Sequence, residues 1–229
     1  PKPSPTSRKK TLRIAASRKD TRCFAPPKAS RSSTSAASTM PPKMAQYMGL
    51  TAPVLCMMTF GDPAEAVRHD IDLAAGSAGY VAAVEAAAVR AGVQARLHLK
   101  ADTGLSRGGA TPADWPAVVA AALAAQARGS VRVTGLWSHF ACADVPGHPS
   151  ITAQLASFAD AVAVAEKAGV SPEVRHIANT AAALTVPESR YDLVRFGGAV
   201  YGLSTLPGGA PSWLRPVMTL RARLAMVKR

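Results

Sequence analysis

From about Gly49 onward, the chain alternates short apolar stretches with longer segments whose apolar residues recur every three or four positions. This alternation limits the possible folds more than any other feature, because strands that alternate with crossover helices form mainly parallel sheets of the α/β class. The pattern predicts strands at residues 52–58, 71–75, 96–100, 131–137, 173–177 and 193–195, and helices at residues 78–90, 111–128 and 150–168.

The predicted strands are short and end in polar residues, which favours a (β/α)8 barrel of the TIM type, with its site at the carboxyl ends of the strands. A doubly wound open sheet is the alternative. It is weakened because no glycine-rich dinucleotide-binding loop follows any predicted strand. Six strands are predicted, fewer than the eight of a complete barrel.

One strand end carries an unusual concentration of polar residues. In the strand at residues 96–100, Leu97 and Leu99 should point to one face and His98 and Lys100 to the other. A turn follows, and then Arg107. A solvated loop is one interpretation; a site for anions is the other.

Other strand ends add His139, Asn179 with Thr180, and Arg195 followed by Gly197 and Gly198. Barrels often bind phosphate in the loops after their last two strands. A hydroxyl at Thr180 and two unshielded N–H groups at the glycines suit a phosphate. Simpler alternatives stay open: buried structural histidines, a turn at the glycines, and an ion pair between Arg195 and Asp192.

Positive charge is concentrated at the N-terminus. Residues 1–43 contain eleven lysines and arginines against a single aspartate, so they carry +10 of the total +13. We expect residues 1–48 to be a disordered basic segment that is not genuine barrel sequence. A targeting segment, a nucleic-acid-binding tail and out-of-frame translation of a GC-rich gene are three explanations.

Composition argues against several classes of protein. The cysteines, Cys23, Cys56 and Cys142, are too few and too scattered for a disulfide framework or a metal site, so we expect no metal. No apolar run approaches the length of a signal peptide core or a membrane span. We therefore expect a cytoplasmic protein that does not bind a membrane.

Four motifs, in order and at characteristic spacing, give the chain from about Gly49 onward a strong resemblance to the alanine racemases, pyridoxal-phosphate enzymes of fold type III. They are His98–Arg107, Gly135–Asp144, His176–Ala182 and Val194–Gly202. The resemblance implies a racemase barrel at residues 49–210, incomplete because its first strands are missing or corrupted. It also implies that residues 211–229 are the start of a C-terminal β-domain, and that the protein is a homodimer when it is complete.

The resemblance also implies roles for the strand-end residues. Arg195 would donate a hydrogen bond to the pyridine nitrogen of pyridoxal phosphate, and His139 would be a partner of Arg195. Thr180, Gly197 and Gly198 would hold the phosphate. Arginine keeps its proton at any working pH, so the ring nitrogen would stay unprotonated and side reactions would be restrained.

Two more residues would act near the substrate. Arg107 would hold the phenolic oxygen of the cofactor and the substrate carboxylate, and Lys100 stands where such enzymes carry a carbamate that orients this arginine. The sequence departs from the family at four places. Phe196 replaces a proline, Gly198 a branched apolar residue and Ser106 a glycine, while Thr180 replaces a serine and keeps the hydroxyl.

The sequence contains neither of the two catalytic bases of the family, a lysine and a tyrosine. Nothing in residues 1–48 resembles the motif of the lysine that binds the cofactor covalently, and the tyrosine of the C-terminal domain would lie beyond Arg229. The activity implied is interconversion of L- and D-alanine, which supplies D-alanine for peptidoglycan, but we expect the chain as written to be inactive. Alternatives are a non-catalytic pyridoxal-phosphate-binding barrel fragment and, with little support, a nucleic-acid-binding protein.

Overall fold

The computed structural model describes residues 13–16, 53–58, 61–209, 211, 213–217, 219 and 226. Five parallel strands form one sheet in the order β2 (Leu55–Cys56), β3 (Asp72–Ala75), β4 (Ala95–Lys100), β5 (Val131–Trp137) and β6 (Val174–His176). Two further strands, β1 (Arg13–Ala16) and β7 (Leu193–Phe196), pair in parallel with each other. All seven follow the parallel arrangement that the alternation predicts.

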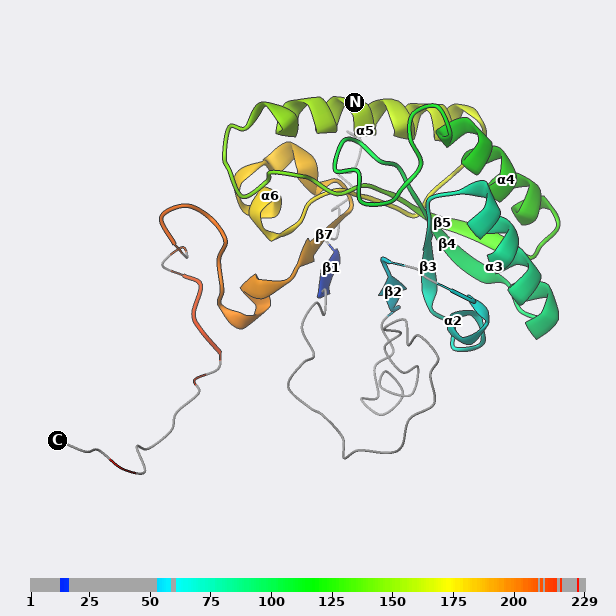
Figure 1. Ribbon diagram of the computed structural model, residues 1–229, viewed down its shortest axis with the longest axis horizontal. Coiled ribbons are helices and arrows are strands. Elements are labelled where there is room, and N and C mark those ends of the chain that lie inside the picture. Colours follow the sequence, from blue (N-terminus) through cyan, green and yellow to red (C-terminus); the bar gives the residue numbers. More distant parts are fainter. Residues whose placement is uncertain are drawn as a thin grey trace, which may run out of the picture.

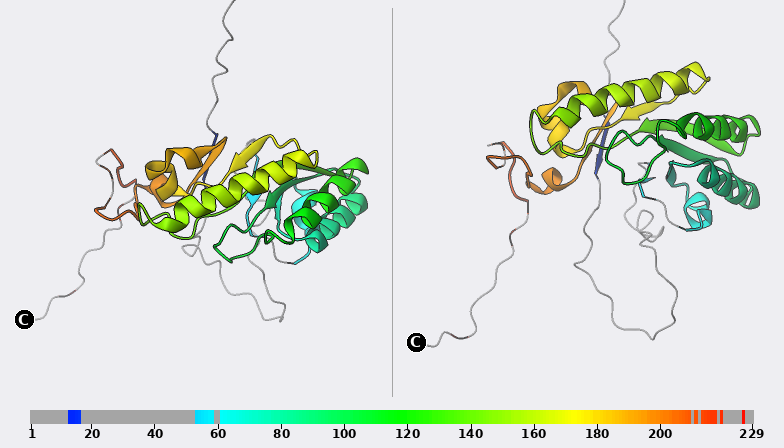
Figure 2. Two further views of the ribbon diagram at one scale, coloured as in Figure 1. Left: turned by 90° about the horizontal axis from the view of Figure 1, so that it is seen from above. Right: turned by 45° about the horizontal axis from the view of Figure 1, so that its top comes forward.

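Helices cross between the strands. They are α2 (Ala64–Arg68), α3 (Ala78–Ala91), α4 (Trp115–Ala127), α5 (Pro149–Lys167) and α6 (Thr180–Thr185), with 3-10 turns at Pro187–Arg190 and Gly198–Tyr201. Figures 1 and 2 show α3, α4 and α5 along the outer side of the curved sheet. Backbone bonds of 3.1 Å, from Asp192 to Arg175 and from Arg195 to Ala178, join β7 to β6. The fold is an incomplete (β/α) barrel.

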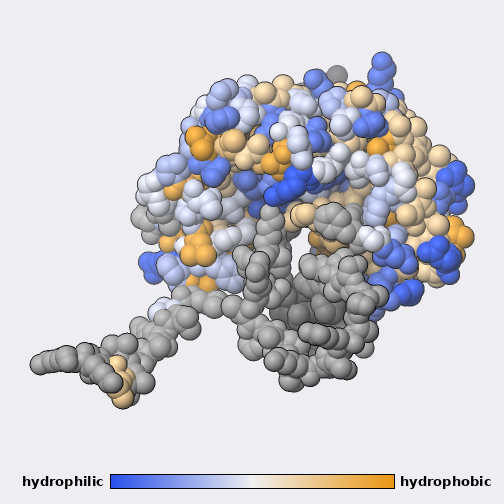
Figure 3. All heavy atoms as spheres, in the orientation of Figure 1, coloured by the Kyte–Doolittle hydropathy of each residue, from blue (hydrophilic) through white to orange (hydrophobic). Residues whose placement is uncertain are grey.

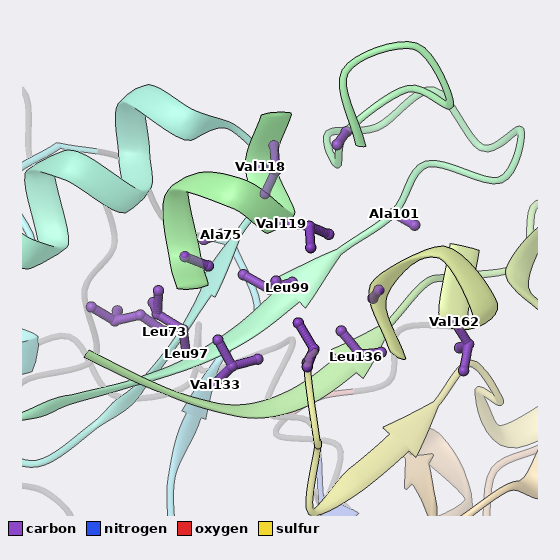
Figure 4. Packing of buried hydrophobic residues seen from close by; sticks show 14 of the residues in the cluster. Leu73, Ala75, Leu97, Leu99, Ala101, Val118, Val119, Val133, Leu136 and Val162 are labelled. Atoms are coloured by element: carbon purple, nitrogen blue, oxygen red, sulfur yellow. The ribbon is translucent and has the colours of Figure 1, made fainter. Parts of the chain in front are cut away.

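The hydrophobic core lies between the outer face of the sheet and these helices (Figure 4). Leu97 and Leu99 of β4 are fully buried there, whereas His98 and Lys100 point to the barrel interior and contact other polar or aromatic groups. The alternation predicted for this strand is confirmed. On the face shown in Figure 3, hydrophilic and hydrophobic residues are interspersed.

A bulge in β5 decides which side chains enter the barrel. Leu97 pairs with Val133, but His98 pairs with Gly135, so Thr134 is the extra residue. Such an insertion reverses the alternation beyond it. Leu136 therefore packs in the outer core, and Trp137 turns inward beside Lys100 and His176.

Predicted and observed boundaries agree closely except at two places. The strand predicted at residues 52–58 has only two residues in β2, because Pro53 has no N–H and a bend follows Cys56. The helix predicted from Thr111 begins at Trp115. Thr111 forms a separate turn, with its hydroxyl bonded to Asp114, and Pro116 cannot donate the next helical bond.

Residues 1–48 were expected to be a disordered basic segment, whereas Arg13–Ala16 form the strand β1. The strand β1 lies in register with β7, from Arg13 beside Leu193 to Ala16 beside Phe196. The edge of β7 offers unpaired backbone groups, and a short segment with little polarity can satisfy them. The rest of the expectation for residues 1–48 lies outside the described residues.

The expected C-terminal β-domain falls largely outside the described residues, and those described between 211 and 229 form no strand or helix. No helix in the described part of the chain is long and apolar enough to cross a membrane.

Candidate functional site

Arg195 is the central cation of the barrel interior and is only 4% exposed. Its Nη1 donates to Nδ1 of His176 at 2.7 Å, and its Nη2 donates to the carbonyl oxygens of Ser138 at 3.0 Å and Ile177 at 3.1 Å. Burial lowers the pKa of Arg195 to about 9, so the guanidinium stays charged at neutral pH. These bonds hold a cation rigidly at the carboxyl ends of the strands.

One N–H of this guanidinium has no partner: among the described residues, nothing accepts from Nε of Arg195. A buried donor without a partner costs free energy unless a ligand satisfies it. The alternative in which Arg195 pairs with Asp192 is wrong, because Asp192 accepts from Nε of Arg175 at 3.0 Å. Arg195 therefore keeps a donor available for a ligand.

His139 follows β5, and its Nδ1 lies 3.1 Å from Nη2 of Arg195. Its loop is held by Gln154 of α5, whose Nε2 donates to the carbonyl of His139 at 3.1 Å and to the hydroxyl of Thr103 at 3.0 Å. The amide oxygen of Gln154 accepts from Ala141 N–H at 2.9 Å. Sequence reasoning missed Gln154, because nothing in helical periodicity marks a buried polar side chain.

Trp137 is an aromatic platform that sequence reasoning also missed. Its ring stacks on the imidazole of His176 at a centroid distance of 5.6 Å and an interplanar angle of 12°. Nζ of Lys100 lies 4.7 Å from the ring centroid, and the guanidinium carbon of Arg195 lies 5.0 Å from it. The indole N–H of Trp137 is buried and, among the described residues, has no acceptor.

Lys100, at the end of β4, and Arg107, in the loop that follows, lie near each other. Nζ of Lys100 donates to the backbone carbonyl of Arg107 at 3.1 Å. Arg107 is exposed, and its guanidinium makes no hydrogen bond or ion pair with the described residues. The turn before it places Ser106 at a φ of +55°, a conformation that favours glycine.

The predicted phosphate-binding residues come together at one point. Thr180 begins α6, and Gly197 follows β7; the N–H of Gly197 donates to the hydroxyl of Thr180 at 3.0 Å. Gly198 is exposed, and a Cβ there would lie 3.3 Å from Cβ of Leu203. A branched residue at position 198 therefore requires a small shift of Leu203.

A buried row of polar groups runs from Arg195 of β7 to Asp72 of β3. His176 Nε2 lies 2.9 Å from His98 Nδ1, and His98 Nε2 lies 3.3 Å from the carboxylate of Asp72. Burial, the charge of Arg195 and His98 together hold the pKa of His176 well below its usual range. Burial raises the pKa of Asp72, but its bonds to His98 and Arg96 outweigh this effect and lower it.

The parallel strands form an incomplete barrel, and cations gather at their carboxyl ends. These two features place the chain in the class of (β/α)-barrel enzymes. Residues 43–205 match the family described as alanine racemase, N-terminal domain. The chain belongs to the alanine racemase family.

The relatives give the extent of the match. The alanine racemase of Streptomyces coelicolor is 55% identical over 181 residues, which cover 76% of this chain and 46% of the relative. That of Thermobifida fusca is 52% identical, covering 79% and 49%. The solved alanine racemase of S. coelicolor A3(2) superposes with a TM-score of 0.74, at 53% identity, over 77% of this chain and 48% of that one. The chain thus spans about half the length of these relatives.

Proposed function

We propose that this chain forms the cofactor-binding barrel of an alanine racemase, with pyridoxal phosphate as the cofactor and alanine as the substrate. The observation that carries the proposal is the N–H at Nε of Arg195 in the barrel interior, which finds no acceptor among the residues that the structure describes. A pyridine nitrogen is an acceptor of the kind that this donor lacks. The resemblance of the four motifs and the family membership support the same assignment.

The residues present fit the cofactor at both of its ends. Arg195 is held by His176 and by two backbone carbonyls, so Nε presents a fixed donor to a ring nitrogen. At the other end, Thr180 and Gly197 meet beside β7, although they are distant in sequence. They offer a hydroxyl and N–H groups to a phosphate. A phosphate would replace the bond that these two residues make with each other.

When bound, pyridoxal phosphate withdraws electrons from the substrate and makes the proton on its α-carbon acidic. The protein's part is to hold the cofactor in place and to restrain side reactions. Arg195 remains a donor and does not give its proton to the ring nitrogen, which limits side reactions. Trp137 and the buried histidines exclude water around Arg195. Arg107, exposed beside the site, supplies a cation for the substrate carboxylate.

The remaining assignments are proposals of the same kind. We propose a barrel at residues 49–210, the start of a β-domain at residues 211–229, a homodimer, a cytoplasmic location and a role in supplying D-alanine to the cell wall. Exposed apolar side chains follow the 3-10 turn at Gly198–Tyr201, where the β-domain would begin, and support a surface that another domain covers: Leu203 is 61% exposed, Trp213 64% and Val217 64%.

Titration of the 229-residue chain with pyridoxal phosphate, followed by absorbance and fluorescence, tests the proposal. We expect binding, and a loss of affinity of about tenfold or more for Arg195→Lys, which removes the Nε donor. Arg132→Lys, an exposed arginine at the amino end of β5, is the matched control and should bind as the unaltered chain does. Equal affinities in all three proteins would contradict the role of Arg195.

An alanine racemisation assay tests the activity. For residues 1–229 with added cofactor we expect no conversion of L- to D-alanine above that of free pyridoxal phosphate, because racemisation needs a base on each face of the α-carbon. Joined to a racemase segment that supplies the lysine motif and the C-terminal domain, the same barrel should become active. Conversion by residues 1–229 alone would contradict the assignment of the missing bases.

A further inference from the structure

Asp72 is a buried carboxylate with two different donors. Asp72 is 6% exposed and is the first residue of β3. One oxygen, Oδ1, accepts from Nε of Arg96 at 2.5 Å, and the other, Oδ2, lies 3.3 Å from Nε2 of His98. Arg96 is held in place from the other side, because it also donates to the side chain and the carbonyl of Asp70.

The hydrogen bonds that link Asp72 to Arg195 through His98 and His176 can run in only one direction. Arg195 has donors and no acceptor, so Nδ1 of His176 must accept and its Nε2 must carry the proton. His176 then donates to Nδ1 of His98, which leaves the proton of His98 on Nε2, facing Asp72. The tautomers of both histidines follow from the two charged ends.

A strand glycine makes this row possible. Gly135 of β5 lies beside the His98 ring, and a Cβ at that position would be 2.2 Å from Nδ1 of His98. Any side chain there would force the imidazole away from His176. A glycine inside a strand often marks such a close approach.

We propose that Asp72 is a positioning residue, which acts through His98 and His176 to fix the orientation in which Arg195 presents its free donor. The identity of the ligand that receives this donor rests on the proposed function. The row itself rests on the contacts between the four side chains. Asp72 makes no hydrogen bond or ion pair with Arg195 itself, so it acts only through the imidazoles of His98 and His176.

A carboxylate is needed because both of its oxygens accept. In Asp72→Asn, the amide oxygen should turn to the charged Arg96, since a bond to a cation is the stronger one. The amide NH2 then faces Nε2 of His98, and that nitrogen must accept. The proton of His98 moves to Nδ1, where it meets the N–H of His176, and the two donors repel each other.

Nitrogen-15 NMR of the imidazoles, on the purified 229-residue chain at neutral pH, reads the tautomers directly. The unaltered chain should show protonated Nε2 on both His98 and His176. Asp72→Asn should change the tautomer of His98 and shift the signals of His176. Asp70→Asn is the matched control, because Asp70 bonds to the same arginine but not to His98, and it should leave both spectra unchanged.

A second variant separates positioning from a general loss of structure. In Asp72→Asn with Arg96→Met, the amide oxygen is free to turn to His98, so the unaltered tautomers should return even though a charge pair is lost. Unchanged imidazole signals in Asp72→Asn, or no recovery in the double variant, would overturn the proposal.

Affinity for pyridoxal phosphate provides the second readout. We expect Asp72→Asn to bind about tenfold more weakly than the unaltered chain, with Asp70→Asn within about twofold of it and the double variant partly restored. If the unaltered chain does not bind the cofactor, the proposed function fails, while the NMR result still decides the role of Asp72. Equal affinity in Asp72→Asn and the unaltered chain would overturn that role.

Discussion

Ser106 occupies a backbone conformation that costs free energy for any residue with a Cβ. Its φ is +55°, and its N–H donates to Asp102 Oδ1 at 3.0 Å, a bond that glycine would keep. The left-handed region costs an L-residue roughly 1–2 kcal/mol, of which part is offset by the greater freedom of glycine in the unfolded chain.

We therefore expect Ser106→Gly to stabilise the fold by about 0.5–1 kcal/mol, measured by urea unfolding. The control is Ser171→Gly, at an exposed loop position whose φ is not positive. That substitution should be neutral or destabilising. A destabilised Ser106→Gly protein would show that the hydroxyl contributes more than the strain costs.

Gly135 should tolerate no side chain. A Cβ in Gly135→Ala would lie 2.2 Å from His98 Nδ1, so the bond between His98 and His176 must break. We expect a loss of about 1–3 kcal/mol in the free energy of unfolding, as for other overpacked sites. Gly79→Ala, in open space within α3, is the control and should stabilise the protein by up to about 1 kcal/mol. Similar effects at the two sites would contradict this account.

At the scale of elements, α5 positions the loops after β4 and β5 through a single side chain. Gln154 is 2% exposed and bonds to Thr103, His139 and Ala141. The helix thus packs with an apolar face and also holds the backbone beside Arg195. Its length and apolar spacing were predictable, but this polar contact was not.

Gln154→Met keeps the shape of the side chain and removes these three bonds. Because buried groups of the loops lose their partners, we expect a destabilisation of about 2–3 kcal/mol by urea unfolding. Gln94→Met removes one exposed bond, to the carbonyl of Gly129, and should cost less than about 0.5 kcal/mol. Comparable losses in the two variants would mean that Gln154 does not hold the loops.

At the scale of the whole molecule, stability should depend on pH through His176. The pKa of this histidine in the folded state lies well below its usual value of 6.5, so the unfolded chain binds a proton that the folded chain does not. Stability is therefore fully present above pH 6.5 and is lost as the pH falls below it. Asp72, whose pKa is lowered, adds a second loss only at more acidic pH, below its usual value of 3.8.

The free energy of unfolding from urea titrations should be level from pH 8 to 7 and then fall by up to about 1.4 kcal/mol per pH unit below about 6. The sign follows from uptake of one proton on unfolding. A free energy that stays level down to pH 5 would mean that His176 is not buried as a neutral group.

The sequence by itself determined the class of fold and most of the elements, because periodicity and caps are local properties. Ser77 caps the start of α3 and Gly92 caps its end, as these residue types commonly do. The four motifs identified the family and drew attention to Arg195, Thr180, Gly197 and His139. The roles of these residues stay predictions.

Only the tertiary structure decided how distant residues combine. The bulge at Thr134 turns Trp137 inward, and nothing in residues 131–137 alone states which residue the pairing with β4 would skip. The row from Asp72 to Arg195 joins residues of four strands, whose side chains meet because the strands are parallel and in register. Pairing of strands that are far apart along the chain is a property of the assembled sheet, and local pattern does not encode it.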